Sequence, residues 1–525
     1  MTGLGVFLRA FARRDRWMVL SFVVGITILY WSQAPSVDGI YTTREAFEEA
    51  AAMMASNPAF IAMTGPARAL DTTGGQVAWQ SAAFGAVVAG LMSMFLVGRH
   101  TRAEEESARD ELLRAGAVSR RTPMTAASVV VVVANLLVGI GVAASLIAYG
   151  LAVPGALVLG VGLAWTGLAF GAVALLAVQL TSSTRAAYGI TGSVIGVAYA
   201  LRAIGDVSGG GLSWLSPIGW YQAMHAYSGE RWWPLLLLVA FTTLVTAVAY
   251  AAFDRRDFGA GLWPSRPGPE AAGPDLRSAF GLSWRLQRGS VIGWTVGMLL
   301  GGVAYGSIGD DVKSLIGDSE LSREIFVGGA GALVDSFYAT AALMLGLIAC
   351  GFTVSSALRP RTEEDEGRLE ALVATAMPRS TWWLGHAVIT AVGSVAVVAA
   401  GGAGMGIGFA LTTGEWNRFG DLLVATLVML PGVVVLGGIT GLLVGARPRW
   451  SVLAWLVLLY CVVVLMFGQV LRFPDWALDL SPFSHLGRFP AEAVDWAPLT
   501  VVLLVGLGLG AAGLGAFLRR DLVSR

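Results

Sequence analysis

Twelve stretches of the chain are each apolar over 18 or more residues, and this pattern constrains the fold more than any single motif does. The hydrocarbon core of a bilayer, about 30 Å thick, is crossed by about 20 residues of α-helix. The stretches are 17–35, 77–98, 125–149, 156–180, 187–205, 234–253, 289–308, 331–358, 381–411, 420–445, 451–470 and 498–517. The sequence therefore predicts an all-α polytopic membrane protein with about twelve transmembrane helices.

Composition excludes a water-soluble fold for a chain of this length. Hydrophobic residues make up 55% of the 525 residues, charged residues only 13%, and the mean hydropathy is +0.68. Soluble domains carry about 25% charged residues, which cover the surface that faces water. This chain lacks enough polar side chains to build such a surface.

The charged residues are distributed unevenly between the two sides of the predicted membrane. With the N-terminus inside, the inner segments hold 26 of the 35 basic residues but only 16 of the 35 acidic ones. Arginine and lysine close to a span resist translocation, so both termini are predicted to lie on the cytoplasmic side of the membrane. Ser32-Gln33-Ala34 resembles a signal-peptide cleavage site, but Pro35 directly after it would block cleavage, so we expect the first stretch to remain as a membrane anchor.

The chain contains an internal repeat. The segment 102–111 matches 361–370 at a fixed offset, Leu-Ser-Pro recurs at 215–217 and 480–482, and Phe-x-Arg-Arg-Asp recurs at the end of each half. Six spans followed by six spans in the same orientation form a parallel repeat about an axis along the membrane normal. We expect a first half at 1–253, a Pro- and Gly-rich cytoplasmic linker at 254–288, and a second half at 289–525.

The repeated acidic segment lies between the second and third span of each half, near 99–124 and 359–380, on the predicted cytoplasmic side. Glu105 and Arg109, like Glu364 and Arg368, have the i,i+4 spacing of a helical ion pair. One helical face would carry Glu104 and Glu111 in the first copy, and Glu363, Gly367 and Glu370 in the second. Because the segment occurs twice in the same place, we interpret it as a docking surface for a partner; the alternative is a solvated acidic loop.

The second copy, Arg361-x-Glu363-Glu364-x-x-Gly367-Arg368-x-Glu370-x-Leu372 followed by Pro378-Arg379, resembles the coupling-helix signature of ABC-2 type (type V) exporter permeases. The fused twelve-span organisation is similar to actinobacterial polyketide-antibiotic (tetronasin-type) and multidrug exporter subunits along essentially the whole chain. The first copy departs from the signature, with Ala108 in place of the glycine and Ser119 in place of the proline.

The resemblance implies that two copies of a separate ATP-binding subunit, which carries the ATP and Mg²⁺, dock on these segments. The implied coupling residues are Arg102, Glu104, Glu105, Arg109, Glu111, Arg361, Glu363, Glu364, Gly367, Arg368 and Glu370. It also implies an amphipathic elbow helix on the inner membrane surface at the start of each half. Residues 7–16 and 280–288 combine apolar and arginine side chains in a way that suits this role.

The same resemblance implies a substrate cavity lined by the first, second and fifth spans of each half. The aromatic residues on these spans are Tyr30, Trp31, Phe84, Phe95, Tyr199, Trp294, Tyr305, Phe337, Tyr338, Phe352, Tyr460 and Phe467. An apolar, nearly uncharged route suits a hydrophobic or amphiphilic antibiotic or drug, and hence antibiotic resistance by efflux. A lipid or lipopeptide remains an alternative substrate. Membrane lipid is the other expected partner, and no nucleic acid is expected.

Two other classes of membrane protein fit the sequence less well. A proton-coupled transporter needs titrating groups deep in the bilayer, and the predicted spans are nearly free of them, with His386 close to a span end. An enzyme needs a catalytic set, but the four histidines are scattered without metal-ligand spacing. Lys313 is the only lysine and lies outside any Walker A sequence, so ATP must be bound by another polypeptide and this chain is not predicted to be an enzyme.

Overall fold

The computed structural model describes residues 3–40, 48, 58–106, 119–207, 209, 211–257, 259–263, 270–271, 273–308, 329–467 and 473–522. It divides into two compact units, Met1–Pro267 and Gly268–Arg525. The division falls inside the stretch 254–288, which separates the two sets of six apolar stretches. Within the described ranges every regular element is a helix.

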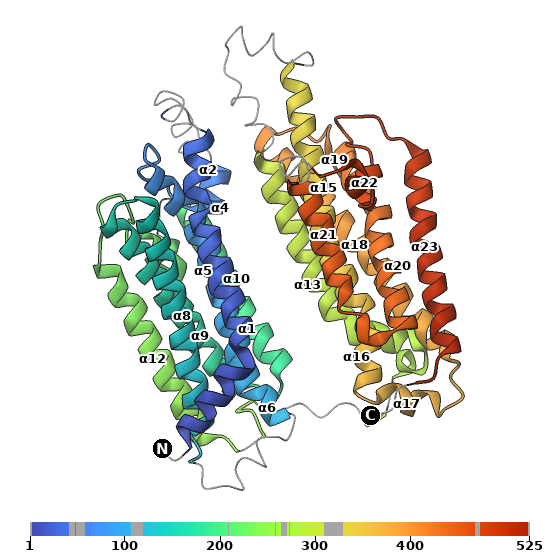
Figure 1. Ribbon diagram of the computed structural model, residues 1–525, viewed down its shortest axis with the longest axis horizontal. Helices are drawn as coiled ribbons and strands as arrows, with labels where there is room; N and C mark the ends of the chain where they lie inside the picture. Colours follow the sequence, from blue (N-terminus) through green and yellow to red (C-terminus); the bar gives the residue numbers. More distant parts are fainter. Residues whose placement is uncertain are drawn as a thin grey trace. The chain divides into compact units, whose positions relative to one another are not determined.

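The first unit is a bundle of long helices with short helices at both ends (Figure 1). Its elements are α1 (Leu4–Trp31), α2 (Gln33–Ile40), α4 (Pro58–Thr64), α5 (Thr73–His100), α6 (Arg102–Glu106), α8 (Thr122–Tyr149), α9 (Val153–Leu180), α10 (Thr184–Val207), η1 (Leu212–Leu215), α11 (Pro217–Gln222) and α12 (Trp233–Arg255). Helix α9 is buried along most of its length and packs against α5, α8, α10 and α12. The other long helices are therefore arranged around α9.

The second unit repeats this order of elements. Its elements are η2 (Pro274–Arg277), α13 (Ala279–Ile308), α15 (Gly329–Ala357), α16 (Arg359–Asp365), α17 (Arg368–Val373), α18 (Arg379–Thr413), α19 (Phe419–Leu427), α20 (Leu430–Ala446), η4 (Pro448–Trp450), α21 (Leu453–Phe467), α22 (Asp475–Asp479), η5 (Pro482–His485) and α23 (Trp496–Arg519). In each unit a short helical segment follows the second long helix, so the repeat seen in the sequence is also a repeat of structure.

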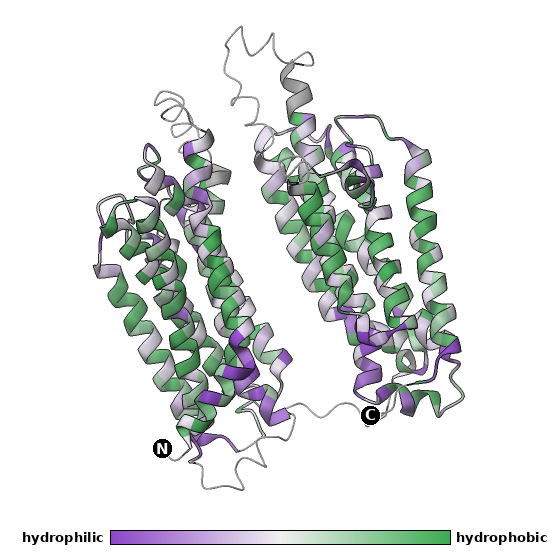
Figure 2. Cartoon of the chain, viewed as in Figure 1, coloured by the Kyte–Doolittle hydropathy of each residue, from purple (hydrophilic) through white to green (hydrophobic). Residues whose placement is uncertain are grey.

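Twelve helices of the described chain are long and apolar enough to cross a membrane, six in each unit, which confirms the predicted spans. Figure 2 shows hydrophobic residues along the long helices and hydrophilic residues gathered near their ends, notably around α6 and α16. The tenth span departs from a single continuous helix, because α19 ends at Leu427 and α20 begins at Leu430. Pro431 lies in the first turn of α20, where its missing N–H costs no helical hydrogen bond.

Helices α13 and α18 approach to backbone contact through glycines. A Cβ atom on Gly302 would lie 2.0 Å from the carbonyl oxygen of Gly401, and one on Gly404 would lie 2.2 Å from that of Leu299. Both helices have glycines four residues apart at this interface, Gly302 with Gly306 and Gly404 with Gly408. Small residues at this spacing let membrane helices pack closely where no hydrophobic effect drives their association.

The segments that follow the first span of each half are only partly described. Residues 41–47, 49–57 and 309–328 lie outside the described residues. Helix α4 follows the first of these segments, and Arg202 of α10 donates hydrogen bonds to the carbonyl oxygens of Ile61 and Met63. The end of α4 is therefore fixed to the side of the first bundle.

Candidate functional site

The two candidate coupling segments, 99–124 and 359–380, lie at the same end of their units as the start of the first long helix and the end of the last one (Figure 1). In the first segment the described residues form the end of α5, the short helix α6 and the start of α8. In the second they form α16, α17 and the start of α18. Each segment is held by arginines that come from distant parts of its own unit.

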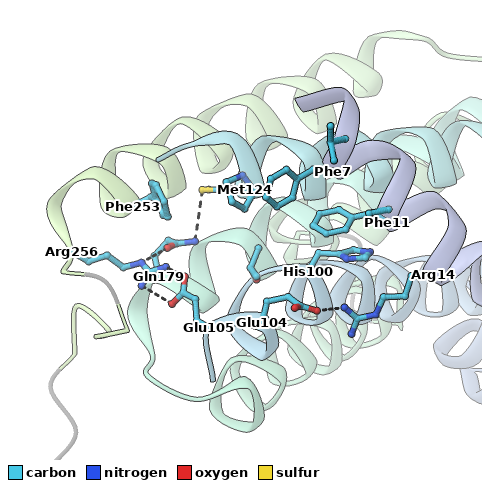
Figure 3. A pocket seen from close by; sticks show the side chains of 14 residues that line it. Phe7, Phe11, Arg14, His100, Glu104, Glu105, Met124, Gln179, Phe253 and Arg256 are labelled. Atoms are coloured by element: carbon cyan, nitrogen blue, oxygen red, sulfur yellow. Dashed lines mark hydrogen bonds and ion pairs between the residues drawn. The ribbon is translucent and has the colours of Figure 1, made fainter. Parts of the chain in front are cut away.

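In the first unit, Glu105 of α6 forms a two-pronged ion pair with Arg256, which follows α12 directly. The two residues are 151 positions apart in the sequence, and both side chains are buried. Arg256 Nε also donates a hydrogen bond of 2.6 Å to Gln179 Oε1 at the end of α9. Arg256 therefore joins α6, α9 and α12 at one point, as Figure 3 shows.

The second unit repeats this arrangement with different partners on one side. Glu364 of α16 accepts hydrogen bonds of 2.6 and 2.5 Å from Arg520, which follows α23. Arg520 Nε donates a hydrogen bond of 2.9 Å to the carbonyl oxygen of Gly445 at the end of α20. A planar guanidinium paired with a carboxylate at two atoms has a fixed geometry, so each pair sets an orientation as well as a distance.

A second arginine completes each cluster by binding the end of the last helix. Arg120 donates to the carbonyl oxygens of Phe253 and Arg256, and Arg379 donates to those of Phe517 and Arg520. Carbonyl groups at a helix C-terminus have no partner within the helix, and arginine side chains commonly satisfy them. We call the two clusters the arginine clasps: Glu105, Arg120, Gln179, Phe253 and Arg256 in the first unit, and Glu364, Arg379, Gly445, Phe517 and Arg520 in the second.

The two segments differ in how the other glutamate is bound. Glu104 forms an ion pair with Arg14 of α1, on the side opposite to Glu105 (Figure 3). In the second unit the equivalent Glu363 is buried and pairs with Arg359, at 2.7 Å, and with Arg368, at 2.6 Å, both from its own segment. The first segment is therefore attached to the first span, whereas the second is braced internally.

A buried cluster beside Glu104 strengthens the attachment of α1 to α5. Asp15 of α1 is 1% exposed and pairs with His100 and with Arg99, the latter at 3.0 Å. The His100 ring stacks on Phe11 with ring centres 3.9 Å apart.

In place of a separate elbow helix, residues 7–16 belong to the continuous helix α1, and residues 280–288 belong to α13. Phe7 and Phe11 of α1 pack on α8, which gives the first turns of α1 a protein surface to cover.

The predicted pairing of Glu364 with Arg368 along one helix is wrong. Helix α16 ends at Asp365, Gly367 has a φ of 72°, and α17 begins at Arg368, so the i,i+4 register is lost. For the same reason Glu363, Gly367 and Glu370 do not share one helical face. Arg368 instead pairs with Glu363 and Glu366, and its hydrogen bond to Glu363 raises the pKa of the Arg368 guanidinium.

Helix α17 presents an acidic surface above an apolar anchor. Leu369 is fully buried among Trp382, Trp383, Val444 and Phe517, so it fixes α17 to the membrane bundle. Glu366, Glu370 and Ala371, which lie close to Leu369 in the sequence, are exposed. An exposed acidic surface held by a buried side chain can bind a basic partner surface without losing its position.

Comparison with known proteins identifies the family. The model of the C-terminal domain of the multidrug efflux system permease Rv1217c matches residues 276–518. The multidrug efflux system permease protein Rv1217c of Mycobacterium tuberculosis (strain ATCC 25618 / H37Rv) is 38% identical over 528 residues, which cover 99% of this chain and 95% of that protein. This chain belongs to the multidrug efflux permeases of the ABC-2 exporter type. The resemblance stated from its sequence is therefore confirmed.

The permease does not use all the predicted coupling residues alike. Arg102 is 1% exposed, forms an ion pair with Glu105 at 2.7 Å and donates to the carbonyl oxygen of Val178 at 2.6 Å. Its counterpart Arg361 lies nearer the surface and pairs with Asp365. Arg109 and Glu111 lie in 107–118, outside the described residues. Of the predicted residues, Glu370 is exposed, whereas Glu363 and Glu364 are buried in ion pairs.

Sequence reasoning missed four residues that hold the segments in place: Asp15, Gln179, Arg256 and Arg520. The sequence Phe-x-Arg-Arg-Asp recurs at the end of each half, and its second arginine is Arg256 in the first half and Arg520 in the second. Gln179 and Asp15 have no such repeat. Their partners come from helices far away in the chain, so no local pattern indicates them.

The predicted cavity aromatics fall into three environments. Tyr338 and Phe352 are fully buried in the core of the second unit, where Tyr338 donates a hydrogen bond to the Gly306 carbonyl oxygen. Phe84 and Phe95 are 55% and 37% exposed on α5 of the first unit. Trp294 and Tyr305 line a depression of about 480 Å³ along the glycines of α13.

The remaining aromatics take other positions. Tyr199 donates to the Met63 carbonyl oxygen, Phe337 packs edge-on against Tyr338, Tyr460 lines a separate cavity between α20, α21 and α23, and the side chain of Phe467 lies outside the described residues. Each of these positions lies within a single unit. Tyr338 and Phe352 contribute to helix packing there.

Proposed function

We propose that this permease is the membrane-spanning subunit of an ATP-driven exporter that removes hydrophobic or amphiphilic drugs from the cell. Two copies of a separate ATP-binding subunit would hold the ATP and Mg²⁺ and would dock on the two candidate coupling segments. Both termini and both segments would then lie on the cytoplasmic side of the plasma membrane, in line with the inward bias of arginine. A lipid or lipopeptide remains the alternative cargo.

The single observation that carries this proposal is the pair of arginine clasps. In each unit a buried ion pair joins the segment after the second span to the end of the last span, Glu105 with Arg256 and Glu364 with Arg520. A force applied to the segment is therefore delivered to several spans at once. Rigid helices joined at fixed points can move as a body, which is how closure of two ATP-binding subunits would change access to a central path.

Charge reversal at Glu370 tests the docking surface. We expect Glu370→Lys, combined with Glu111→Lys in the first segment, to leave membrane insertion and thermal stability unchanged, since Glu370 is exposed. We also expect it to reduce co-purification of the ATP-binding subunit by about tenfold or more, because a like-charge contact at an interface costs several kcal/mol. The measurement is the ratio of the two subunits after affinity purification of the permease.

Glu415→Lys is the matched control. It introduces one Glu→Lys substitution at an exposed position beyond the C-terminus of α18, in the loop that leads to α19, and is compared with Glu370→Lys alone as well as with the double variant. Co-purification should remain at the level of the unmodified protein. If the Glu111→Lys/Glu370→Lys variant also kept its partner, the docking assignment would be wrong.

A second experiment tests the energy source. With the complete exporter in inside-out vesicles and ATP held constant, we expect an uncoupler that collapses the proton gradient to leave drug accumulation unchanged. The physical reason is that the membrane spans carry few titrating groups that could couple to protons. Accumulation is measured as uptake of a fluorescent drug, and its loss under the uncoupler would favour a proton-coupled transporter instead.

A further inference from the structure

The second unit has a cavity of about 780 Å³ at the end of the bundle opposite to its candidate coupling segment. It lies between α20, α21, η5 and α23, and its lining is largely aliphatic. Cavities of about 300–1,000 Å³ accommodate drug-sized molecules. Four lining residues carry polar groups: Tyr460, Cys461, Asp479 and His485. Tyr460 donates its hydroxyl to the Ala477 carbonyl oxygen, which leaves Asp479 and His485 at the polar end.

The first unit has two contacting pairs of aromatic rings at the equivalent positions. The recurring Leu-Ser-Pro at 215–217 and 480–482 aligns Trp214 with Asp479 and Trp220 with His485. In the first unit Trp214 stacks on Trp233 with ring centres 5.3 Å apart. Trp220 packs edge-on against Phe241 at 5.7 Å. These four rings close the gap between the short helices η1 and α11 and the last span α12.

The opposing positions on the last span have also changed in the second unit. The recurring Phe253 and Phe517 align α12 with α23, and they place Ala497 and Val505 where the first unit has Trp233 and Phe241. Two contacting pairs of large rings are thus replaced by an acid, a histidine and two small aliphatic residues. The polar end of the cavity in the second unit is thus built from the residues that stand in place of the two tryptophans.

Charge determines which ligand suits the cavity. Asp479 contributes a carboxylate, and no arginine or lysine is among the residues that line the cavity. His485 Nε2 lies 2.7 Å from the Asp479 carbonyl oxygen, so the two residues are held together on η5 and the end of α22. Both residues are exposed at the mouth of the cavity, and the Asp479 carboxylate is the one charged group among the residues that line it, so it attracts a cation there.

The opening of the cavity faces the side of the bundle. Leu456 of α21 and Val501 of α23 line the cavity and are 57% and 61% exposed. Exposed leucine and valine on membrane-spanning helices contact lipid chains. A ligand that partitions into the bilayer can therefore reach the cavity without crossing water.

We propose that this cavity binds lipophilic cations taken from the bilayer. The bound molecule would place its apolar groups between α21 and α23 and its positive charge beside Asp479. That such a cation is also exported rests on the function proposed above, whereas its binding does not.

Binding of two ions of the same shape and opposite charge tests the proposal. The full-length permease is placed in nanodiscs of phosphatidylcholine, and equilibrium binding of tetraphenylphosphonium and of tetraphenylborate is measured. We expect saturable binding of tetraphenylphosphonium, about tenfold or more tighter in the protein than that of tetraphenylborate. Equal affinity for the two ions in the unmodified permease would overturn the proposal.

Variants locate the site. His485→Trp combined with Val505→Phe rebuilds the ring pair of the first unit and should lower tetraphenylphosphonium affinity by about tenfold or more. Asp479→Asn should remove the preference for the cation while the permease stays folded. Asp475→Asn is the matched control, because Asp475 is exposed on the same short helix and does not line the cavity. If the ring-pair variant folds and binds as the unmodified permease does, or if Asp479→Asn keeps the preference, the assignment fails.

The two proposals fail separately. Glu370→Lys with Glu111→Lys should abolish export of tetraphenylphosphonium by the complete exporter and leave its binding unchanged. If the cation binds at the cavity but is not exported in an ATP-dependent way, the proposed function is contradicted and the binding site stands. If the cation is exported but the unmodified permease and the ring-pair variant bind it equally well, the binding site is contradicted and the proposed function stands.

Discussion

Gly302→Val is expected to destabilise the permease by about 1–3 kcal/mol or more, the usual range for overpacking a close-packed interface. The new side chain would begin 2.0 Å from the Gly401 carbonyl oxygen, which is backbone and has no rotamer to change. Helices α13 and α18 would have to separate along their length, because Gly306 and Gly408 make equally close approaches nearby. Thermal unfolding of the full chain in detergent, followed by size-exclusion chromatography, measures the effect.

Gly297→Val provides a control on the same helix. A Cβ atom at Gly297 would meet nothing within 4 Å, so the added side chain should be accommodated there. The two variants carry the same substitution in α13 and differ in the surface that the residue faces. Equal stability of Gly302→Val and Gly297→Val would contradict the close contact of α13 with α18.

Glu364→Gln should cost about 3–5 kcal/mol of stability, since it leaves the charge of Arg520 buried without a counter-ion. The Glu364 side chain is 4% exposed, and both of its oxygens accept hydrogen bonds from Arg520. Replacing both partners, as Glu364→Met with Arg520→Met, should recover much of the loss, because neither member of this pair is then left without its counter-ion. Thermal unfolding of the full chain is again the measurement.

Asp365→Asn is the control for the second clasp. Asp365 follows Glu364 directly, but it is exposed and its ion pair with Arg361 lies at the surface. Exposed ion pairs contribute about 0–1 kcal/mol. The role given to the clasp would be refuted by a Glu364→Gln variant as stable as Asp365→Asn.

The number and position of the spans were predictable because they depend on local composition. Each span is a run of apolar residues long enough to cross a bilayer, and such a run can be recognised without knowing which other helices it packs against. The repeat of two halves was visible for a similar reason, since motifs such as Leu-Ser-Pro recur in the same order. The structure adds that α19 and α20 share one span, a break that hydropathy alone does not indicate.

The clasps were less accessible to prediction because their partners lie 151 and 156 residues apart. An i,i+4 spacing favoured Arg368 as the partner of Glu364, and that reasoning holds only while the helix continues. Gly367 adopts a positive φ and ends it. Glycine adopts this conformation without steric cost, so a glycine inside a polar helical pattern indicates a place where the helix can end.

The cavity aromatics show a different limit of sequence reasoning. A membrane helix that is apolar all round has no polar face to mark its outer side, so periodicity cannot separate lipid-facing from buried residues. Phe84 and Phe352 occur on corresponding spans, yet one is largely exposed and the other fully buried. Only the packing of α13, α15 and α18 around Phe352 distinguishes them.

The difference between the aromatic-filled wall of the first unit and the open wall of the second has a consequence for assembly. Both walls belong to one polypeptide, so every molecule contains one aromatic wall and one open wall. A transporter assembled from two identical subunits would have two open walls or none. In a fused chain, a substitution in one wall therefore leaves the other wall unchanged.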